Sequence, residues 1–121
     1  MSTNDTYLAV FLGGKTSPRM EAWNALSDSD RRPKERDGIA AWKAWAERHQ
    51  AVIVGMGGPL GKTKKASTRG IEDVSNEMSA FVLVRANSHE DAVKLFETHP
   101  HFTIFPGDAV EVMPVLPIPG A

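Results

Sequence analysis

The sequence predicts an α+β protein whose strands form an antiparallel sheet with helices packed on one face. Short runs of β-forming residues alternate along the chain with two segments of helical periodicity, in the order β, α, β, (β), β, α, β. This order resembles the split βαβ, or ferredoxin-like, arrangement. The 121 residues suffice for a single domain with one core, predicted over about residues 6–115 and followed by a proline-rich tail at 116–121.

Four segments have the composition of buried or half-buried strands. They are residues 7–12, 52–54, 79–85 and 109–115. Between the second and the third, residues 62–70 are polar and basic, with one weak strand near Thr68. Residues 71–77 are predicted as a loop.

Two longer segments have the periodicity of helices. In residues 37–50, large side chains recur every three or four positions, at Ile39, Trp42, Trp45 or Ala46, and His49. In residues 88–99, Ser88 and Asp91 fit a capping box, and Pro100 is predicted to end the helix. Residues 20–26 form a short helix, and residues 31–37 a solvated helix start that carries Pro33 in its first turn.

Composition excludes several classes of function. The net charge of −1 gives no electrostatic basis for binding nucleic acid or an anionic membrane. The absence of cysteine removes disulfides, thiol nucleophiles and thiolate metal sites, and it fits a reducing cytoplasm. The N-terminus lacks the pattern of a signal peptide, and no apolar run approaches the ~20 residues of a membrane span.

The glycine-rich segment 55–61 is similar to a phosphate-binding loop but lacks its key residues. Met56 stands where the first glycine of that motif is required, and Leu60 where a dinucleotide-binding loop needs its third glycine. No helical pattern follows to receive a phosphate. We therefore predict a turn in which glycines such as Gly58 supply positive φ angles. The lysines that follow are predicted as a solvated loop rather than an anion site.

His99 and His101 are the candidate catalytic residues. Separated by one proline, they lie at the predicted C-terminal end of the second long helix. The helix dipole favours a charged imidazole there, so the sequence predicts a raised pKa for His99. The pair could converge on a ligand or act as acid and base, or one could simply cap the helix while the other is partly exposed. A metal would need a further ligand such as Glu97, Asp108 or Glu111, and we predict no metal and no other cofactor.

Trp42, Trp45 and Phe102 are the candidate ligand-binding residues. The two tryptophans lie three positions apart on the predicted helix, so we expect them to face different ways. One would pack in the core, and the other would form the flat apolar wall of a pocket. Packing in the core alone is the alternative.

Several stretches together resemble the YCII-related family, also called the DGPF-domain family. They are residues 52–60, 79–84, 87–92, 97–100 and 109–115, and residues 7–12 suit the first strand of that family. Their order and spacing carry the resemblance, which runs over about residues 39–115. It implies a dimeric α/β barrel, in which two ferredoxin-like protomers face each other through their sheets, with a cleft between the sheet and the helices of each.

The chain departs from the family pattern in two places. The Asp-Gly-Pro-Phe signature is absent, and residues 71–75 stand in its region. Some members carry a His–Asp dyad, but here His99 occupies the aspartate position, and residues 39–42, where the histidine of the first helix would lie, contain none. Enzymatic members of the family act on small cyclic or aromatic-derived compounds, and they include a dehydrochlorinase.

Two functions follow from the resemblance and the histidines. The first is a cofactor-free lyase or isomerase that acts on a small molecule with His99 or His101 as general acid or base. The second is a non-catalytic protein that binds a small ligand, which the missing histidine of the first helix favours. For both we expect a homodimer, because the sheet face opposite the helices would otherwise expose valines and isoleucines.

Overall fold

The computed structural model describes residues 5–120. Four strands form the main sheet, namely β1 (Thr6–Leu12), β2 (Ile53–Pro59), β5 (Met78–Arg85) and β6 (Ala109–Pro114). A separate hairpin consists of β3 (Thr63–Ser67) and β4 (Gly70–Val74). The helices are α1 (Pro18–Asn24), α2 (Asp28–Arg48), α3 (His89–Lys94) and α4 (Pro100–Thr103).

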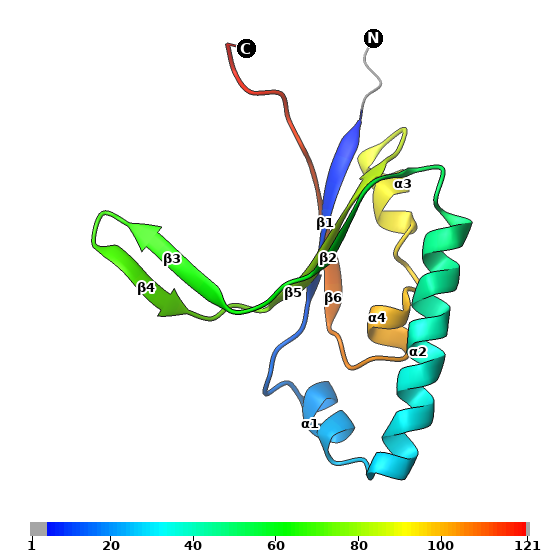
Figure 1. The fold of residues 1–121 in the computed structure, drawn as a ribbon. Helices are drawn as coiled ribbons and strands as arrows, with labels where there is room; N and C mark the ends of the chain where they lie inside the picture. The colour runs from blue at the N-terminus through cyan, green and yellow to red at the C-terminus, as the bar shows by residue number, and fades with distance from the viewer. Residues whose placement is uncertain (1–4, 121) are drawn as a thin grey trace.

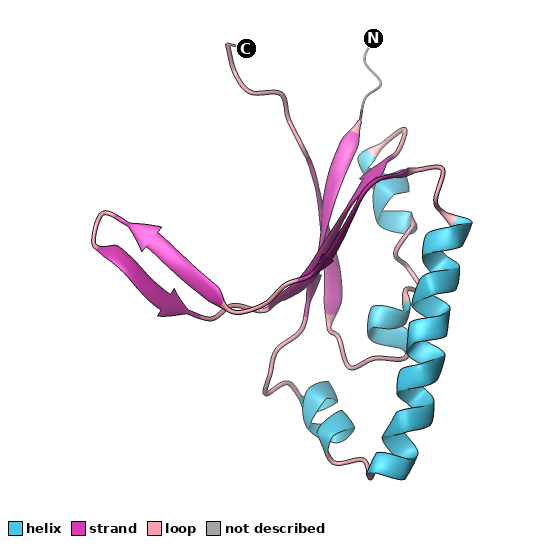
Figure 2. Ribbon diagram, in the orientation of Figure 1, coloured by secondary structure: helices cyan, strands magenta, loops and turns pink. Residues whose placement is uncertain are grey.

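The main sheet confirms the predicted α+β, ferredoxin-like fold. Its strand order is β2-β5-β1-β6, and each neighbouring pair is antiparallel. This is the order of a split βαβ unit, in which a strand inserted later in the chain separates two strands joined by a helical crossover. Helices α2, α3 and α4 lie on one side of the sheet, whereas the β3–β4 hairpin and the C-terminal segment extend from the other side (Figures 1 and 2).

The core lies between the sheet and helices α2 and α3. Alternate residues of β1 and β5 point into it, and their register places Ala9 opposite Val82. Phe11 is its largest fully buried side chain and packs edge-on against Phe96 at a ring separation of 5.9 Å. No helix within residues 5–120 is both long enough and apolar enough to cross a bilayer.

The glycine-rich segment is strand, not the predicted turn. β2 runs through it and pairs with β5 across register shifts, so the glycines lie in a bulged edge strand. Gly57 has the positive φ, 61°, and a Cβ there would lie 2.0 Å from the carbonyl oxygen of Phe81. Gly58 does not have a positive φ, so the expectation that it supplies one was wrong. A Cβ on Gly58 would also meet no atom within 4 Å.

The β3–β4 hairpin was predicted as a loop with a weak strand near Thr68. Thr68 instead lies in the turn between two five-residue strands. Opposite charges stand across the strands, with Lys64 Nζ 2.6 Å from an Asp73 carboxylate oxygen and Lys65 Nζ 3.5 Å from that of Glu72. Such cross-strand pairing stabilises strands that are otherwise polar, which the apolar pattern of the sequence does not reveal.

Two helix boundaries differ from the prediction. α2 begins at Asp28, where the Ser27 hydroxyl accepts a hydrogen bond from the Asp30 amide, so Pro33 lies inside the helix rather than in its first turn. α3 begins as predicted, with the Ser88 hydroxyl accepting from the Asp91 amide at 3.0 Å, but it ends at Lys94. The following proline begins α4 instead of ending a helix, because the first position of a helix needs no amide hydrogen.

Candidate functional site

A cavity of about 760 Å³ lies between α2 and the sheet. The wall contributed by helices and turns consists mainly of apolar side chains, namely Ile39, Trp42, Trp45, Ala46 and Phe105. The sheet contributes Phe11, Ile53, Met56 and Val82. His101 and Lys43 are the titratable side chains of the lining, which makes the cavity an aromatic pocket with two basic groups.

His101 lies in the cavity wall and is anchored at its ring. The side chain is 6% exposed, and Nε2 lies 2.8 Å from the Leu12 carbonyl oxygen. A carbonyl only accepts, so Nε2 carries the proton and Nδ1 keeps a lone pair. Burial lowers the pKa of His101, and the charge of Arg19 acts in the same direction. Backbone hydrogen bonds with Leu12 and Ala109 and the charge of Asp108 act in the opposite direction without reversing the shift, so the neutral imidazole predominates at pH 7.

His99 does not line the cavity. Its ring is fully buried and forms edge-on contacts with Trp42 at 4.5 Å, Trp45 at 4.7 Å and Phe11 at 4.9 Å. Its Nδ1 accepts a hydrogen bond from the backbone amide of His101 at 3.0 Å. Within the described residues, Nε2 has no hydrogen-bond partner.

The predicted increase in the pKa of His99 was wrong in sign. Burial lowers this pKa from 6.5 to about 3, and the like charges of His101 and His49 act in the same direction. The reason is the position of the helix boundary. Because α3 ends at Lys94, His99 is the N-cap of α4 and not the C-terminus of the longer predicted helix. No carboxyl-end dipole is therefore available to offset the loss of water.

Trp42 and Trp45 face the same region, contrary to the prediction. Both line the cavity and both contact the ring of His99. Trp45 is the more deeply buried, at 4% exposure, and its indole N–H donates to the Leu95 carbonyl at 2.8 Å. Residues three positions apart are neighbours on the surface of a helix, so both indole rings can join one aromatic cluster.

Arg19 anchors the turn that follows His101, a contact that the sequence did not suggest. Its Nε donates to the Gly107 carbonyl at 3.0 Å, and its guanidinium also donates to the carbonyls of Phe102 and Phe105. A Cβ on Gly107 would lie 2.2 Å from the His101 ring, so this glycine lets the chain pack against the imidazole. Arg19 and Gly107 are 88 positions apart in the sequence, so this contact could not be predicted from local sequence patterns.

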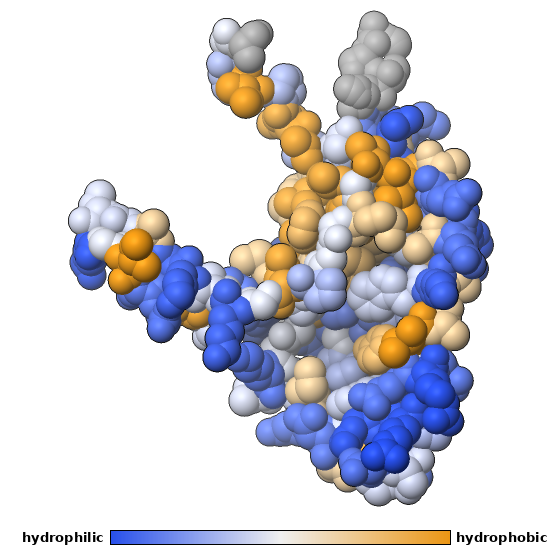
Figure 3. Space-filling model, in the orientation of Figure 1, coloured by the Kyte–Doolittle hydropathy of each residue, from blue (hydrophilic) through white to orange (hydrophobic). Residues whose placement is uncertain are grey.

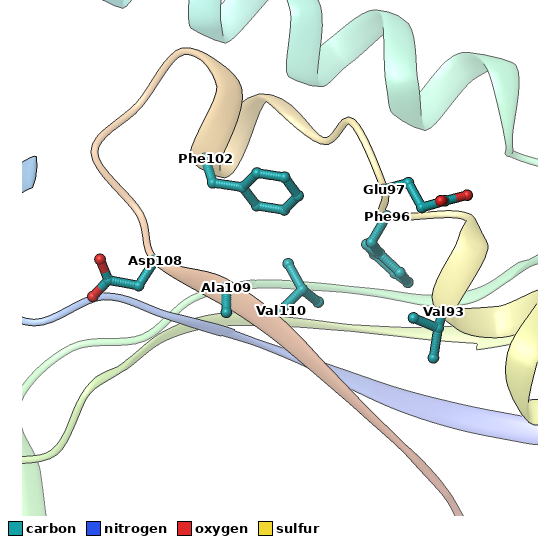
Figure 4. A pocket seen from close by; sticks show the side chains of 7 residues that line it. All are labelled: Val93, Phe96, Glu97, Phe102, Asp108, Ala109 and Val110. Carbon is teal, nitrogen blue, oxygen red and sulfur yellow. The ribbon is translucent and has the colours of Figure 1, made fainter.

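Phe102 lies in a different hollow. This smaller hollow, about 250 Å³, lies between α3, α4 and β6 and includes Phe96, Glu97 and Asp108 in its lining. Figure 4 shows the Phe102 ring directed into it, whereas the carboxylates of Glu97 and Asp108 point away. The structure therefore separates Phe102 from the two tryptophans with which it was grouped. In the part of the chain that the structure describes, no group of three His, Asp or Glu side chains is arranged to hold a metal ion.

The fold is similar to that of a solved structure of 5-chloro-2-hydroxyhydroquinone dehydrochlorinase (TftG) from Burkholderia phenoliruptrix AC1100 in complex with 2,5-dihydroxybenzoquinone. The TM-score is 0.52 at 19% sequence identity, and the match covers 89% of this chain and 90% of that chain. No protein-family model matches the chain, and no curated protein is significantly similar to it. The likeness establishes a shared α+β fold, and membership of the YCII-related family stays a prediction.

Proposed function

We propose that this protein binds a small, flat, largely apolar molecule in the cavity between α2 and the sheet. The observation that carries the proposal is the lining itself, in which Trp42, Trp45 and Phe11 surround a space with one neutral imidazole in its wall. Aromatic walls favour planar ligands, and a single fixed polar group orients them. A ring compound with hydroxyl or carbonyl substituents meets both conditions.

The first form of this function is a cofactor-free lyase or isomerase with His101 as general acid or base. The Nδ1 lone pair of His101 would take a proton from the ligand, and the same proton would return to another atom in an isomerisation. In an elimination, the electrons of the broken C–H bond would form a new double bond, and the leaving group would depart with the electron pair of its own bond to carbon. We assign this role to His101 rather than His99, because His99 is fully buried and lies outside the cavity lining.

The second form is binding without catalysis. Lys43 and His101 are the titratable groups of the lining, and the lining contains no carboxylate. General acid–base pairs usually combine groups whose pKa values differ, and a neutral imidazole with a lowered pKa is a weak base. This composition favours a carrier or sensor that recognises its ligand by shape.

The ligand of the similar fold supplies a concrete probe. We expect 2,5-dihydroxybenzoquinone to bind with micromolar to millimolar affinity, measured by isothermal titration calorimetry. Trp42→Leu, in the cavity, should weaken binding by at least about tenfold. Phe102→Leu, in the separate hollow, is the matched control and should leave binding unchanged. Equal effects of the two substitutions would contradict the assignment of the cavity.

His101→Gln separates the two forms of the function. Gln retains a hydrogen-bonding group but cannot exchange a proton at neutral pH. In a binding protein the variant should keep probe affinity within about threefold. In an enzyme it should keep binding yet lose turnover of a chlorinated hydroquinone, followed as chloride release, by at least about a hundredfold.

We also propose that two copies associate through the outer face of the sheet. Residues on that face form apolar rows across the strands, with Leu8 placed beside Leu83 on one side and Met113 on the other. Figure 3 shows apolar residues along the C-terminal segment and on the sheet between this segment and the hairpin. A second copy presents the same apolar rows, as a two-fold interface requires. It would lie between the C-terminal segment and the β3–β4 hairpin.

Sedimentation velocity tests the dimer. The wild type should sediment as a dimer at micromolar concentration, and Leu83→Lys should shift it to monomer by burying a charge between the sheets. Val93→Lys is the control, because Val93 is an exposed apolar residue on α3, a helix on the other side of the sheet. A monomeric wild type would exclude the proposal.

A further inference from the structure

We propose that His99 is a positioning residue for the cavity, whose Nδ1 lone pair holds the backbone of His101 and thereby fixes the imidazole that faces the ligand. This rests on the proposed function, which places His101 in contact with a ligand. His99 itself is not part of the cavity lining. It accepts a hydrogen bond from the His101 amide and packs against Trp42, Trp45 and Phe11, so it would act through these lining residues.

His99 holds His101 through the N-terminal cap of α4. This helix has four residues, and its first residue is a proline without an amide hydrogen. The amide of His101 is therefore the N-terminal donor that the cap must satisfy, and it donates to Nδ1 of His99 at 3.0 Å. The other helices, α1, α2 and α3, are capped by serine hydroxyls. Only α4 uses a ring for this purpose among the described helices.

The His99 imidazole is held in one orientation. Phe96, Trp42, Trp45 and Phe11 all contact the His99 imidazole, so its orientation is fixed by packing on several sides. An imidazole that accepts at Nδ1 and is neutral carries its proton on Nε2. That Nε2 lies among the aromatic rings without a hydrogen-bond partner in the described residues, and such a buried donor costs stability. A side chain needed only to fill space would avoid this cost.

The cap bond couples His99 to His101. His101 is held at its backbone by His99 and at its ring by the Leu12 carbonyl, so both ends of the residue are fixed. Protonation of His99 would convert Nδ1 from acceptor to donor and break the first of these bonds. The titratable groups that act on His99 are His49, the C-cap of α2, and His101 itself, whereas Asp108 and Arg19 act on His101.

Long-range ¹H–¹⁵N NMR of ¹⁵N-histidine-labelled protein reads the tautomers directly, with or without a ligand. In the wild type at pH 7.5, His99 should have an unprotonated Nδ1 and a protonated Nε2. His101 should show the same tautomer because its Nε2 donates to Leu12. A proton on Nδ1 of His99 would overturn the proposal, since the cap bond would then be absent.

Two substitutions of His99 distinguish its role as the hydrogen-bond acceptor that caps α4 from its role as a ring that fills space in the core. The side-chain oxygen of His99→Asn can replace Nδ1 as the acceptor, since Asn is a preferred N-cap. His99→Phe retains an aromatic ring but has no acceptor. We expect His99→Asn to keep the His101 ring signals in place and the affinity for 2,5-dihydroxybenzoquinone within about threefold. His99→Phe should displace the His101 signals and weaken the probe by at least about tenfold.

The outcomes also separate this proposal from the proposed function. A wild type that binds no probe would reject the function, while the His101 signals would still decide the positioning role. Unchanged His101 signals in His99→Phe would overturn positioning even if the probe binds. Should His99→Phe fail to fold, as judged by circular dichroism, the wild-type tautomer and His99→Asn decide the question. Displaced His101 signals in His99→Asn would contradict the proposed acceptor.

Discussion

The two faces of the main sheet have similar apolar character but different surroundings. On the helix side, the register aligns Val82, Ala9 and Val112 in one row that helices cover. On the other side, the neighbouring row is Leu83, Leu8 and Met113, and Met113 remains 38% exposed. A sheet buried on both faces has continuous apolar strands rather than alternating ones. The covered face therefore accounts for the pocket, and the open face is the surface on which we propose that a second copy packs.

The largest expected effect tests how strongly the covered face depends on one aromatic ring. Trp45→Ala should lower the free energy of unfolding by ~3–5 kcal/mol, the typical cost of removing a buried aromatic side chain. The loss includes a hydrogen bond, because the Trp45 indole donates to the Leu95 carbonyl. Trp42→Ala should cost less than half as much, since Trp42 is only partly buried. Urea unfolding of both variants measures the difference, and equal losses would contradict it.

The second-largest loss of stability is expected in β2, the edge strand of the main sheet. Gly57→Ala should cost ~2–4 kcal/mol, because φ at this position is 61° and the added Cβ would lie 2.0 Å from the Phe81 carbonyl oxygen. The matched control is Gly58→Ala, one position further on, where the Cβ meets no atom within 4 Å. Its cost should stay below about 1 kcal/mol. Thermal denaturation of the pair checks this, and the reverse ranking would show that the bulge is misplaced.

Sequence reasoning succeeded where the information was local and apolar. The main strands, the capping of α3 by Ser88 and the fold class all follow from residues that are neighbours along the chain. It failed where distant residues decide the outcome. The contact of Arg19 with Gly107 and the aromatic surroundings of His99 depend on elements that meet only in the folded chain. The sign error for His99 arose because one helix end was placed five residues too late, at residue 99 instead of Lys94.

The third effect is a dependence of stability on pH that comes from the covered face alone. His99 has a folded pKa of about 3 against 6.5 when exposed, so the unfolded chain binds more protons between these values. Stability is complete above about pH 6.5 and falls with acid by ~1.4 kcal/mol per pH unit for each such histidine. Between pH 6.5 and 5, His99 alone accounts for about 2 kcal/mol, and the lowered pKa of His101 adds in the same direction.

His99→Asn is the variant that isolates this dependence. Because Asn does not titrate, the slope of unfolding free energy against pH should decrease by up to one proton between pH 6.5 and 5. The comparison uses slopes, so a constant loss of stability does not affect it. Thr68→Ser, an exposed substitution in the β3–β4 turn that removes no titratable group, is the control. An unchanged slope in His99→Asn would show that His99 binds as many protons in the folded protein as in the unfolded chain over this range. An effect confined to pH above 7 would restore the raised pKa that the sequence suggested.

The smallest expected effect lies on the open side, in the β3–β4 hairpin. Ile71 is 78% exposed, and the register pairs it with Ala66 across the strands, far from the core cluster. Ile71→Ser should therefore change the free energy of unfolding by less than about 0.5 kcal/mol at concentrations where the chain is monomeric.

An isolated two-stranded hairpin is only marginally stable in water, so a hairpin that remains ordered needs a surface to pack on. If that surface is the second copy, Ile71→Ser should raise the dimer dissociation constant by about tenfold in sedimentation equilibrium, since one large apolar side chain is lost from the interface. Thr68→Ser, in the turn of the same hairpin, should leave the dissociation constant unchanged. A dissociation constant unaffected by Ile71→Ser but raised by Leu83→Lys would restrict the interface to the sheet and leave the hairpin outside it.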